Sequence, residues 1–526
     1  MASFEQRRRD RLEKLKVAKE EVLKSMWEPQ KRAPPGSLRI AVYNVLADAM
    51  SDDGFLVRPI LADWPAGRDL VPTKDGDPVP FHQLLADMLA AKGNVDALQQ
   101  CQTKYNLPKS KDNTHATVDW KARLSQMMCF LECFCPDILV FTEVDHYDDF
   151  LDSLRELGYV SQLPGSTSKY RPAHLDSFSD TTPEKARHFQ QEWDARGFAF
   201  LPHLASISMH VYMQNTGLGK RILEAAAKTK DPSLAQKIKD PKKDLLSRKW
   251  YQQLPPGASR VLLEQAGYKE PERLDDMGVA IFWKDRRLVA TELRTHTYPG
   301  GGKGFIQVKL QDRRSPGSSL VVMGTHLSSG DSPKDEEERL TCELACEGGL
   351  IQAIEAVRAS GENLVVCMDA NSDPASRPAT SKASCWQELH RATGASVWDG
   401  FYDANGVYID PGKGPKGPKE SLEKPVTTNK VRGPQSAQAK KIGNHAYSAI
   451  DHIFYTPGNL SFHEHVYQPR QFPNEERALE EVLPSLKDPS DHYPVIADLM
   501  WQTGGAGAAG APYPQKVDPK PKGPKS

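Results

Sequence analysis

The sequence contains no run of about 18 consecutive apolar residues, the length that a membrane-spanning helix requires. Its N-terminal segment is charged but has no apolar stretch behind it, so we do not expect a signal peptide. The eight cysteines form no paired C-x₂-C set, which favours reduced thiols in a cytoplasmic or nuclear protein. The formal net charge is −1, so only a local basic patch would attract nucleic acid.

Hydrophobic residues make up 39% of the 526-residue chain, below the roughly 45–50% of an average globular protein. Residues 1–36 alternate basic and acidic side chains, which predicts a charged helical leader. Residues 37–502 are expected to form one domain, with a helical insertion at 173–273 where strand alternation is missing. Residues 503–526 are rich in Gly, Ala, Pro and Lys, and we expect this tail to be disordered.

Short β-rich runs between these limits predict buried strands. The runs lie at 38–46, 138–143, 279–283, 288–297, 305–310, 320–326 and 364–368. Apolar residues at helical spacing predict helices at 120–135, 146–157 and 335–360. The glycine-rich segment 300–304 lacks the spacing of a phosphate-binding loop, so we expect it to close a hairpin between two strands.

Several strand-like runs lead directly into polar side chains that can bind metal or phosphate. These residues are Asn44, Glu143, His326, Asp369, Asn371, Asp451, Asp491 and His492. A single Asp after a strand is usually a turn or cap residue, so the interpretation depends on the ordered set. Mg²⁺ prefers oxygen ligands and keeps several waters, so one or two carboxylates suffice to hold it. The other groups can then hold phosphate and orient water.

The order of these residues resembles the endonuclease/exonuclease/phosphatase superfamily. The matching segments are Val42-Tyr-Asn44, Thr142-Glu143, Gly324-Thr-His-Leu327, Met368-Asp-Ala-Asn371, Ile450-Asp-His-Ile453 and Ser490-Asp-His492. Asp373-Pro374 is similar to the nocturnin-like, deadenylase-type branch in particular. Lys430 and Arg432 match the phosphate-binding pair of that branch.

The resemblance implies an α+β fold, a four-layer αββα sandwich of two packed β-sheets with outer helices. It also implies a metal-dependent phosphoric ester hydrolase that uses Mg²⁺, with Mn²⁺ as a substitute. By the same resemblance, Glu143, Asn44 and Asp491 would bind the metal. Asp369 would orient or deprotonate the attacking water.

The remaining residues of the set would act on the phosphate. The resemblance gives Asn371 and His326 the role of holding phosphate oxygens. His492, paired with Asp451, would stabilise charge on the pentavalent phosphorus. Groups of this kind act mainly by positioning and electrostatics.

Three positions depart from the pattern of the superfamily. Thr142 stands where Gln is common before the metal-binding Glu, and Ser328 stands where Lys usually follows Thr-His-Leu. Met368 stands where Gly is common before the catalytic Asp, and it would be strained if that position required a positive φ. We expect these changes to tune activity rather than to abolish it.

Three functions remain open at this point. A 3′–5′ RNA exonuclease of deadenylase type is the first expectation. A phosphatase acting on a nucleotide or other small molecule, such as the 2′-phosphate of NADP, is the second. A binding protein with a degraded site is the third, although the complete acidic and histidine set argues against it. We expect an RNA or nucleotide-type phosphate ester as partner and no membrane.

Overall fold

The computed structural model describes the strands and helices that surround the predicted site. The described residues are 33–47, short pieces between 70 and 105, 120–166, 197–202, 224–230, 277–298, 303–315, 317–380, 383–410, 414–415, 424–432, 444–472, 474–479, 481–485 and 488–502. Nearly all of the predicted leader 1–36, most of the predicted insertion 173–273 and the tail 503–526 lie outside them.

One sheet has seven strands, in the order β18-β19-β1-β4-β7-β5, with β6 also pairing with β7. The bounds are β1 Ser37–Asn44, β4 Ile138–Val144, β5 Tyr159–Val160, β6 Phe200–Pro202, β7 Gly278–Lys284, β18 Leu460–His465 and β19 Val495–Trp501. β1 and β4 run parallel at its centre, and their neighbours β19 and β7 run antiparallel to them. The C-terminal ends of β1 and β4 therefore meet at one edge of the sheet.

The second sheet has six strands, in the order β12-β17-β11-β10-β9-β8. The bounds are β8 Leu288–Thr297, β9 Gly304–Asp312, β10 Ser319–His326, β11 Asn363–Asp369, β12 Ala395–Ser396 and β17 Asp451–Tyr455. β10 and β11 are the parallel pair here. β8 and β9 form the hairpin predicted around the glycine-rich segment, with Thr297 opposite Gly304.

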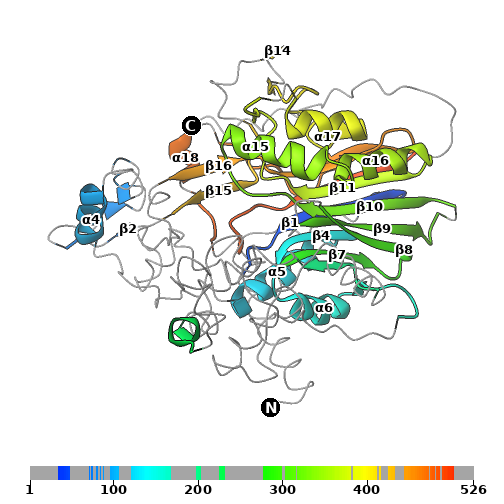
Figure 1. Cartoon of the computed structure of the whole chain (residues 1–526), viewed down its shortest axis with the longest axis horizontal. Helices are drawn as coiled ribbons and strands as arrows, with labels where there is room; N and C mark the ends of the chain where they lie inside the picture. Colours follow the sequence, from blue (N-terminus) through cyan, green and yellow to red (C-terminus); the bar gives the residue numbers. More distant parts are fainter. Residues whose placement is uncertain are drawn as a thin grey trace, which may run out of the picture.

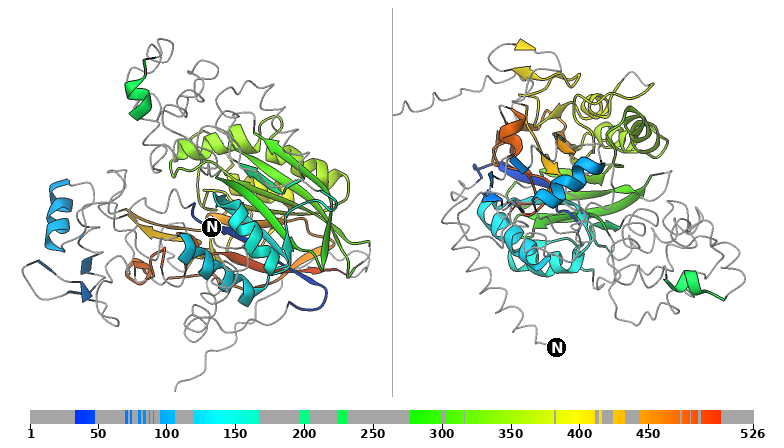
Figure 2. Two further views of the ribbon diagram at one scale, coloured as in Figure 1. Left: turned by 90° about the horizontal axis from the view of Figure 1, so that it is seen from below. Right: turned by 90° about the vertical axis from the view of Figure 1, so that its left-hand side faces the viewer.

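Helices cover the outer face of each sheet, and the predicted four-layer sandwich is confirmed (Figure 1). The helices below the first sheet are α5 Trp120–Phe134 and α6 Tyr147–Glu156, and those above the second are α15 Pro333–Arg339, α16 Leu350–Ala359 and α17 Cys385–Thr393. Figure 2 shows the same layering from two further directions. The remaining elements are α4 Val95–Lys104, α18 Glu475–Leu479 and the two-stranded pairs β2 Leu70–Val71 with β3 Val79–Pro80, β13 Ile409–Asp410 with β14 Gly414–Pro415, and β15 Thr428–Val431 with β16 His445–Ser448.

The central strands are buried on both faces, which explains their continuous apolar sequence. Val42 and Val140 belong to the core between the two sheets. Their neighbours Tyr43 and Phe141 belong to the core beneath α5 and α6. Alternate residues of one strand therefore serve two different cores, and burial of both sets holds β1 and β4 rigidly in place.

The two sheets approach each other closely where β10 crosses β4. A Cβ atom added at Gly324 would lie 2.8 Å from Val140 Cγ1, closer than packed side chains allow. This contact explains why glycine stands two residues before His326, and it fixes the distance between the β10 and β4 strand ends.

The single helix predicted at 335–360 is wrong. α15 begins at Pro333 with a capping box between Ser332 and Asp335, and it passes into a π-helical turn at Leu340–Leu344. The chain then turns and starts α16 at Leu350. Gly348 adopts a φ of +77° in the break, a conformation that favours glycine and that a continuous α-helix excludes. The Gly348-Gly349 pair is the sequence signal that marks this break.

The described part of the predicted helical insertion also differs from expectation. Residues 224–228 are helical, but β6 at Phe200–Pro202 pairs antiparallel with β7 as part of the first sheet. Phe200 is fully buried and stacks on Tyr147 of α6. The segment therefore contributes a strand to the core. Among the described residues, no helix has the length and apolar character needed to cross a bilayer.

Candidate active site

Strand register brings the predicted polar residues to one end of the sandwich. Asn44 pairs with Thr142 at the ends of β1 and β4, which places Asn44 beside Glu143. In the second sheet His326 pairs with Asp369 across β10 and β11, and Asp369 pairs with Asp451 across β11 and β17. Both parallel pairs end at the same side of the molecule, so residues from both sheets lie close together.

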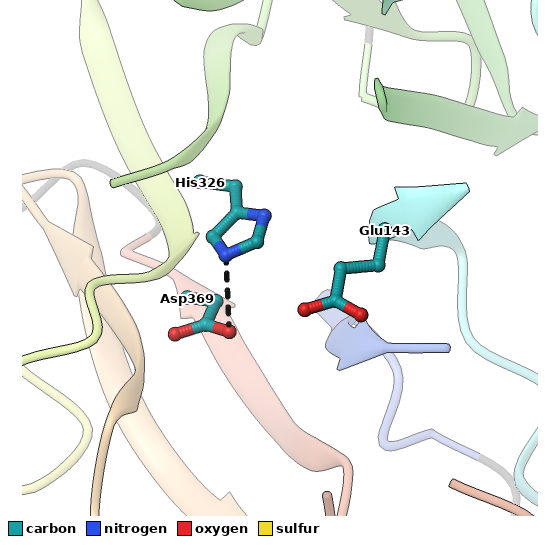
Figure 3. Close-up of side chains that lie close together, drawn as sticks. All are labelled: Glu143, His326 and Asp369. Atoms are coloured by element: carbon teal, nitrogen blue, oxygen red, sulfur yellow. Dashed lines mark ion pairs between the residues drawn. The ribbon is translucent and has the colours of Figure 1, made fainter. Parts of the chain in front are cut away.

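Glu143, His326 and Asp369 form the centre of this cluster (Figure 3). Each offers an oxygen or nitrogen atom, and these atoms lie within 4.8 Å of one another. Asn44 links the two carboxylates, because its Nδ2 donates to Glu143 Oε1 at 2.9 Å and to Asp369 Oδ2 at 2.8 Å. Its Oδ1 accepts from the Leu46 amide at 2.9 Å. Asn44 therefore acts as a donor between the carboxylates and does not turn its oxygen toward them.

Two residues of the site adopt left-handed backbone conformations that non-glycine residues rarely take. The φ angle is +58° at Glu143 and +47° at Asn371. Such conformations cost on the order of 1–3 kcal/mol each and persist where the surrounding structure imposes them. Glu143 is the penultimate residue of β4 and Asn371 lies two residues beyond β11, and the side chain of each contacts the cluster.

His326 and Asn371 lie side by side next to Asp369. Asn371 Nδ2 lies 3.0 Å from His326 Nε2 and also donates to the Leu327 carbonyl at 3.0 Å. The carbonyl fixes the orientation of the amide, so His326 Nε2 is the acceptor of the first bond. His326 Nε2 lies 3.6 Å from Asp369 Oδ2, and the Asn371 backbone amide donates to Asp369 Oδ1 at 2.9 Å.

His492 and Asp451 form a buried pair on the other side of Asp369. His492 Nδ1 lies 2.8 Å from Asp451 Oδ2, and His492 Nε2 lies 4.0 Å from Asp369 Oδ2. Burial alone would lower the pKa of His492, but the carboxylates of Asp451 and Asp491 raise it to about 9. The imidazole is therefore positively charged at neutral pH.

Asp491 joins the predicted phosphate-binding pair to the cluster. Its Oδ2 forms an ion pair with Lys430 Nζ on β15. Burial would raise the pKa of Asp491, but Lys430, His492 and Arg432 hold it well below its usual range. The structure thus brings both Lys430 and Arg432 near the site, on the β15–β16 hairpin.

The donor set fits a divalent cation. Burial raises the pKa of Glu143, and the Asp491 carboxylate raises it further. Burial and the Asp451 carboxylate likewise raise the pKa of Asp369. Asp491 Oδ1 is buried and has no hydrogen-bond partner among the described residues. Crowded carboxylates with an unsatisfied oxygen match the preference of Mg²⁺ for oxygen ligands, and a cation there would reverse the raised pKa values.

The three departures from the superfamily pattern have different structural consequences. Met368 lies inside β11 in register with Thr325 and His452, so its extended backbone carries no strain. Thr142 is buried, and its hydroxyl has no hydrogen-bond partner within the described part of the chain. Ser328 donates from its amide and its hydroxyl to Glu343, at 2.9 and 2.5 Å.

Sequence reasoning assigned no role to three residues that lie at or behind the cluster. Ser490 Oγ donates to the Asn44 carbonyl at 2.6 Å, and Thr427 Oγ1 accepts from the Ile450 and Asp451 amides at 2.9 and 3.1 Å. Lys303 lies in the glycine-rich hairpin, but its side chain is buried and donates to the Leu327 carbonyl. A hydroxyl or a lysine in a loop gives no local signal of such a contact.

Comparisons with known proteins give structural neighbours only. No protein-family model matches the chain, and no curated protein matches it in sequence. The human nocturnin catalytic domain with bound sulfate is 13% identical, with a TM-score of 0.41, and the alignment covers 90% of this chain and 100% of that one.

Two other solved structures are similar at comparable levels. ANGEL2, a 2′,3′-cyclic phosphatase, in complex with adenosine-2′,3′-vanadate is 12% identical, with a TM-score of 0.40, covering 89% of this chain and 97% of that one. TDP2 of D. rerio with a single-strand DNA product is 10% identical, with a TM-score of 0.32, covering 88% and 98%. Nocturnin and ANGEL2 are thus among the solved structures that this chain is similar to.

Proposed function

We propose that this protein is a metal-dependent phosphoesterase whose site is formed by the strand-end cluster. The observation that carries the proposal is the convergence of Glu143, His326 and Asp369 from both sheets, with donor atoms within 4.8 Å of one another. Asp451 and His492 form a second group with Asp369 within the same limit. Carboxylates, a charged histidine and amide donors in one buried place suit phosphoryl transfer, which depends on positioning and electrostatic stabilisation.

Asp369 is the residue that receives the proton of the attacking water. Burial and the Asp451 carboxylate raise its pKa in the metal-free protein, and bound Mg²⁺ would keep the carboxylate ionised and able to accept that proton. Asn44 and the Asn371 amide hold its two oxygens at 2.8 and 2.9 Å. As the new P–O bond forms and the ester P–O bond breaks, the water proton passes to Asp369 and the leaving oxygen takes a proton from solvent.

His492 stabilises the negative charge that develops on phosphorus. Asp451 holds its Nδ1 at 2.8 Å, which directs Nε2 toward Asp369. The pKa of about 9 keeps the ring charged through the neutral range. Asn371 and His326 lie next to Asp369 and would hold the phosphate oxygens once bound phosphate replaces the hydrogen bond between them.

Glu143 and Asp491 are the residues that would hold Mg²⁺, with Asn44 orienting the Glu143 carboxylate. A bound Mg²⁺ supplies positive charge that polarises a phosphoryl oxygen. The unsatisfied Asp491 Oδ1 and the raised pKa of Glu143 support this assignment. Mn²⁺ has the same preference for oxygen ligands and would replace it.

RNA is the substrate that we propose, degraded from its 3′ end as in deadenylases. Lys430 and Arg432 support this choice, because they place positive charge on a hairpin beside the site. Arginine offers a planar fork to phosphate, and lysine a point charge. A polynucleotide extends beyond the scissile phosphate, and cations on such a hairpin can bind its further phosphates.

The test is a parallel assay of the purified protein with Mg²⁺ against oligo(A), mixed RNA, single-stranded DNA and NADP⁺. We expect turnover of the RNA substrates, its loss in EDTA and its recovery with Mg²⁺ or Mn²⁺. Absence of turnover on every phosphoester in the panel would refute the phosphoesterase proposal. Rapid removal of the NADP⁺ 2′-phosphate with inert RNA would replace the exonuclease by a nucleotide phosphatase.

Salt dependence sharpens the choice of substrate. Each phosphate contact of a polynucleotide releases counterions, so KM for oligo(A) should rise steeply with salt. An Arg432→Ala variant should show a higher KM and a shallower salt slope for RNA. An unchanged dependence of KM on salt in this variant would show that Arg432 does not contact the substrate.

A further inference from the structure

Lys303 is a buried lysine directly beside the proposed phosphate-binding residues. It precedes β9, its side chain is 5% exposed, and its Nζ donates to the Leu327 carbonyl at 2.5 Å. Asn371 Nδ2 donates to the same carbonyl oxygen, and it also contacts His326 Nε2. The Lys303 ammonium and the Asn371 amide therefore share an acceptor on the side of the cluster where His326 lies.

The Lys303 ammonium has no carboxylate partner in the described part of the chain. No carboxylate oxygen among the described residues lies within the ion-pair distance of 4.0 Å. The nearby Glu343 carboxylate already accepts from the Ser328 amide and hydroxyl. Leu327 O is a neutral acceptor and uses one of the three N–H donors of the ammonium.

A buried charge without an ion partner is costly, and proteins usually pair it or neutralise it. Burial accordingly lowers the pKa of Lys303, although Glu343, Asp369 and Glu143 act in the opposite direction. An anion next to Lys303 would offset this cost and keep the ammonium charged. Asn371 shares the Leu327 carbonyl with Lys303 and contacts His326, so an anion beside Lys303 would lie next to these two residues.

We propose that Lys303 binds the scissile phosphate of the substrate, together with His326 and Asn371; this inference rests on the proposed phosphoesterase function. Lys303 then supplies a fixed positive charge in addition to that of His492, and it comes from the β8–β9 hairpin rather than from the segment before β19. Sequence alone assigns the hairpin a purely connecting role.

A structural role makes a different prediction for the same residue. If Lys303 only ties the hairpin to Leu327, its removal lowers the melting temperature and leaves phosphate affinity unchanged. If it serves the phosphate, Lys303→Met removes a costly buried charge, so the melting temperature of the ligand-free protein stays equal or rises. The affinity for phosphate then falls.

The experiment compares wild type, Lys303→Met, Lys303→Arg and Lys309→Met. Lys309 is the matched control, because it lies on β9, the strand that Lys303 precedes, but pairs with Glu362. Calorimetric titration with inorganic phosphate in Mg²⁺ buffer gives Kd without turnover, and steady-state assays with oligo(A) give kcat and KM. A lost charge-assisted contact should weaken phosphate binding by about 10- to 100-fold in Lys303→Met. Lys303→Arg, which keeps the charge, should retain part of the affinity, and Lys309→Met should match wild type.

The outcomes separate this inference from the proposed function. A wild type without turnover on any phosphoester refutes the function, while the phosphate titration still reports on Lys303. Unchanged phosphate affinity in Lys303→Met overturns the inference, and so does a lower melting temperature without loss of affinity. If Lys303→Met does not fold, Lys303→Gln takes its place: a 10-fold or larger loss of phosphate affinity supports the inference, and wild-type affinity overturns it.

Discussion

The two ends of β1 both carry buried charges, but they differ in how those charges are compensated. At the start of the strand, Arg39 forms a bidentate ion pair with Asp498 at 2.9 Å and donates to the Phe134 carbonyl at 2.8 Å. Arg287 lies beside it and pairs with Asp137 at 2.6 Å and with Asp312 at 3.2 Å. At this end of the strand every described carboxylate of the group has an arginine partner.

At the C-terminal end of β1 the buried carboxylates are not each paired with an arginine. Its described carboxylates are Glu143, Asp369, Asp451 and Asp491, and the cations that contact them are His492 and Lys430. Asp451 Oδ1 and Asp491 Oδ1 have no hydrogen-bond partner among the described residues. The first cluster is complete without a ligand and holds sheet and helix together, whereas the second has unused ligand atoms. We therefore interpret the group at the C-terminal end of β1 as a functional site and the group at its start as a structural ion network.

The largest expected effect is at the C-terminal end of β1. Asp369→Asn should lower kcat by roughly 10²- to 10⁴-fold, the usual contribution of a positioned proton acceptor. The fold should persist, because one negative charge is removed from a crowded buried group, although the new amide can accept only one of the two hydrogen bonds that Asn44 and the Asn371 amide donate to Asp369. The assay uses the substrate that wild type hydrolyses fastest, with the exposed Asp285→Asn as control. Near-wild-type turnover in Asp369→Asn would assign the chemistry to another residue.

At the start of β1, the expected effect is on stability. Arg39→Met leaves Asp498 buried without a partner, which should cost about 3–5 kcal/mol of unfolding free energy. Denaturant unfolding measures this loss, and the double change Arg39→Met/Asp498→Leu should recover much of it. Activity per folded molecule should not change. If Arg39→Met instead impaired turnover as strongly as Asp369→Asn, the two ends would not be functionally distinct.

The protonation of His492 predicts a pH dependence of stability without metal. Its folded pKa of about 9 lies above the ordinary 6.5, so its stabilisation is complete below about pH 6.5 and is lost as pH rises through about 9. The shift corresponds to a contribution on the order of 3 kcal/mol. In EDTA, His492→Gln should flatten this part of the stability curve, and the exposed His463→Gln should not. Parallel curves for wild type and His492→Gln would contradict the charged imidazole.

The smallest effect is expected at Thr142, behind the site. Its buried hydroxyl has no described hydrogen-bond partner, so Thr142→Val should stabilise the protein by roughly 1 kcal/mol. Thr428→Val is the contrasting change, because the Thr428 hydroxyl donates to the Asp491 carbonyl at 2.8 Å. Thermal unfolding should show a higher midpoint for the first variant and a lower one for the second. Equal destabilisation by the two changes would mean that the Thr142 hydroxyl forms a hydrogen bond in the folded protein.

Much of the site could be predicted because strand order and strand ends are readable in the sequence. Asn44, Glu143 and Asp369 follow β-rich runs, and parallel pairing places such ends together. The two-sheet fold followed from the motif order in the same way. Alternating burial in β1 and β4 then explains why these runs are apolar throughout.

The parts that could not be predicted depend on contacts that have no local pattern. Lys303 lies in a hairpin that looks exposed, and only packing against the Leu327 segment buries it. β6 is three residues long, too short for its alternation to be recognised, yet pairing with β7 makes it part of the sheet. The ion network at Arg39 joins residues up to 459 positions apart in sequence.

Calorimetric titration with Mg²⁺ tests the central distinction between the two ends of β1 most directly. Wild type, Glu143→Gln and Glu388→Gln are compared, the last being a surface control on α17. We predict one site in wild type and in Glu388→Gln, with affinity lost or strongly reduced in Glu143→Gln. A wild type that takes up no Mg²⁺, or a Glu143→Gln variant that binds it as wild type does, would contradict the proposed metal-dependent site.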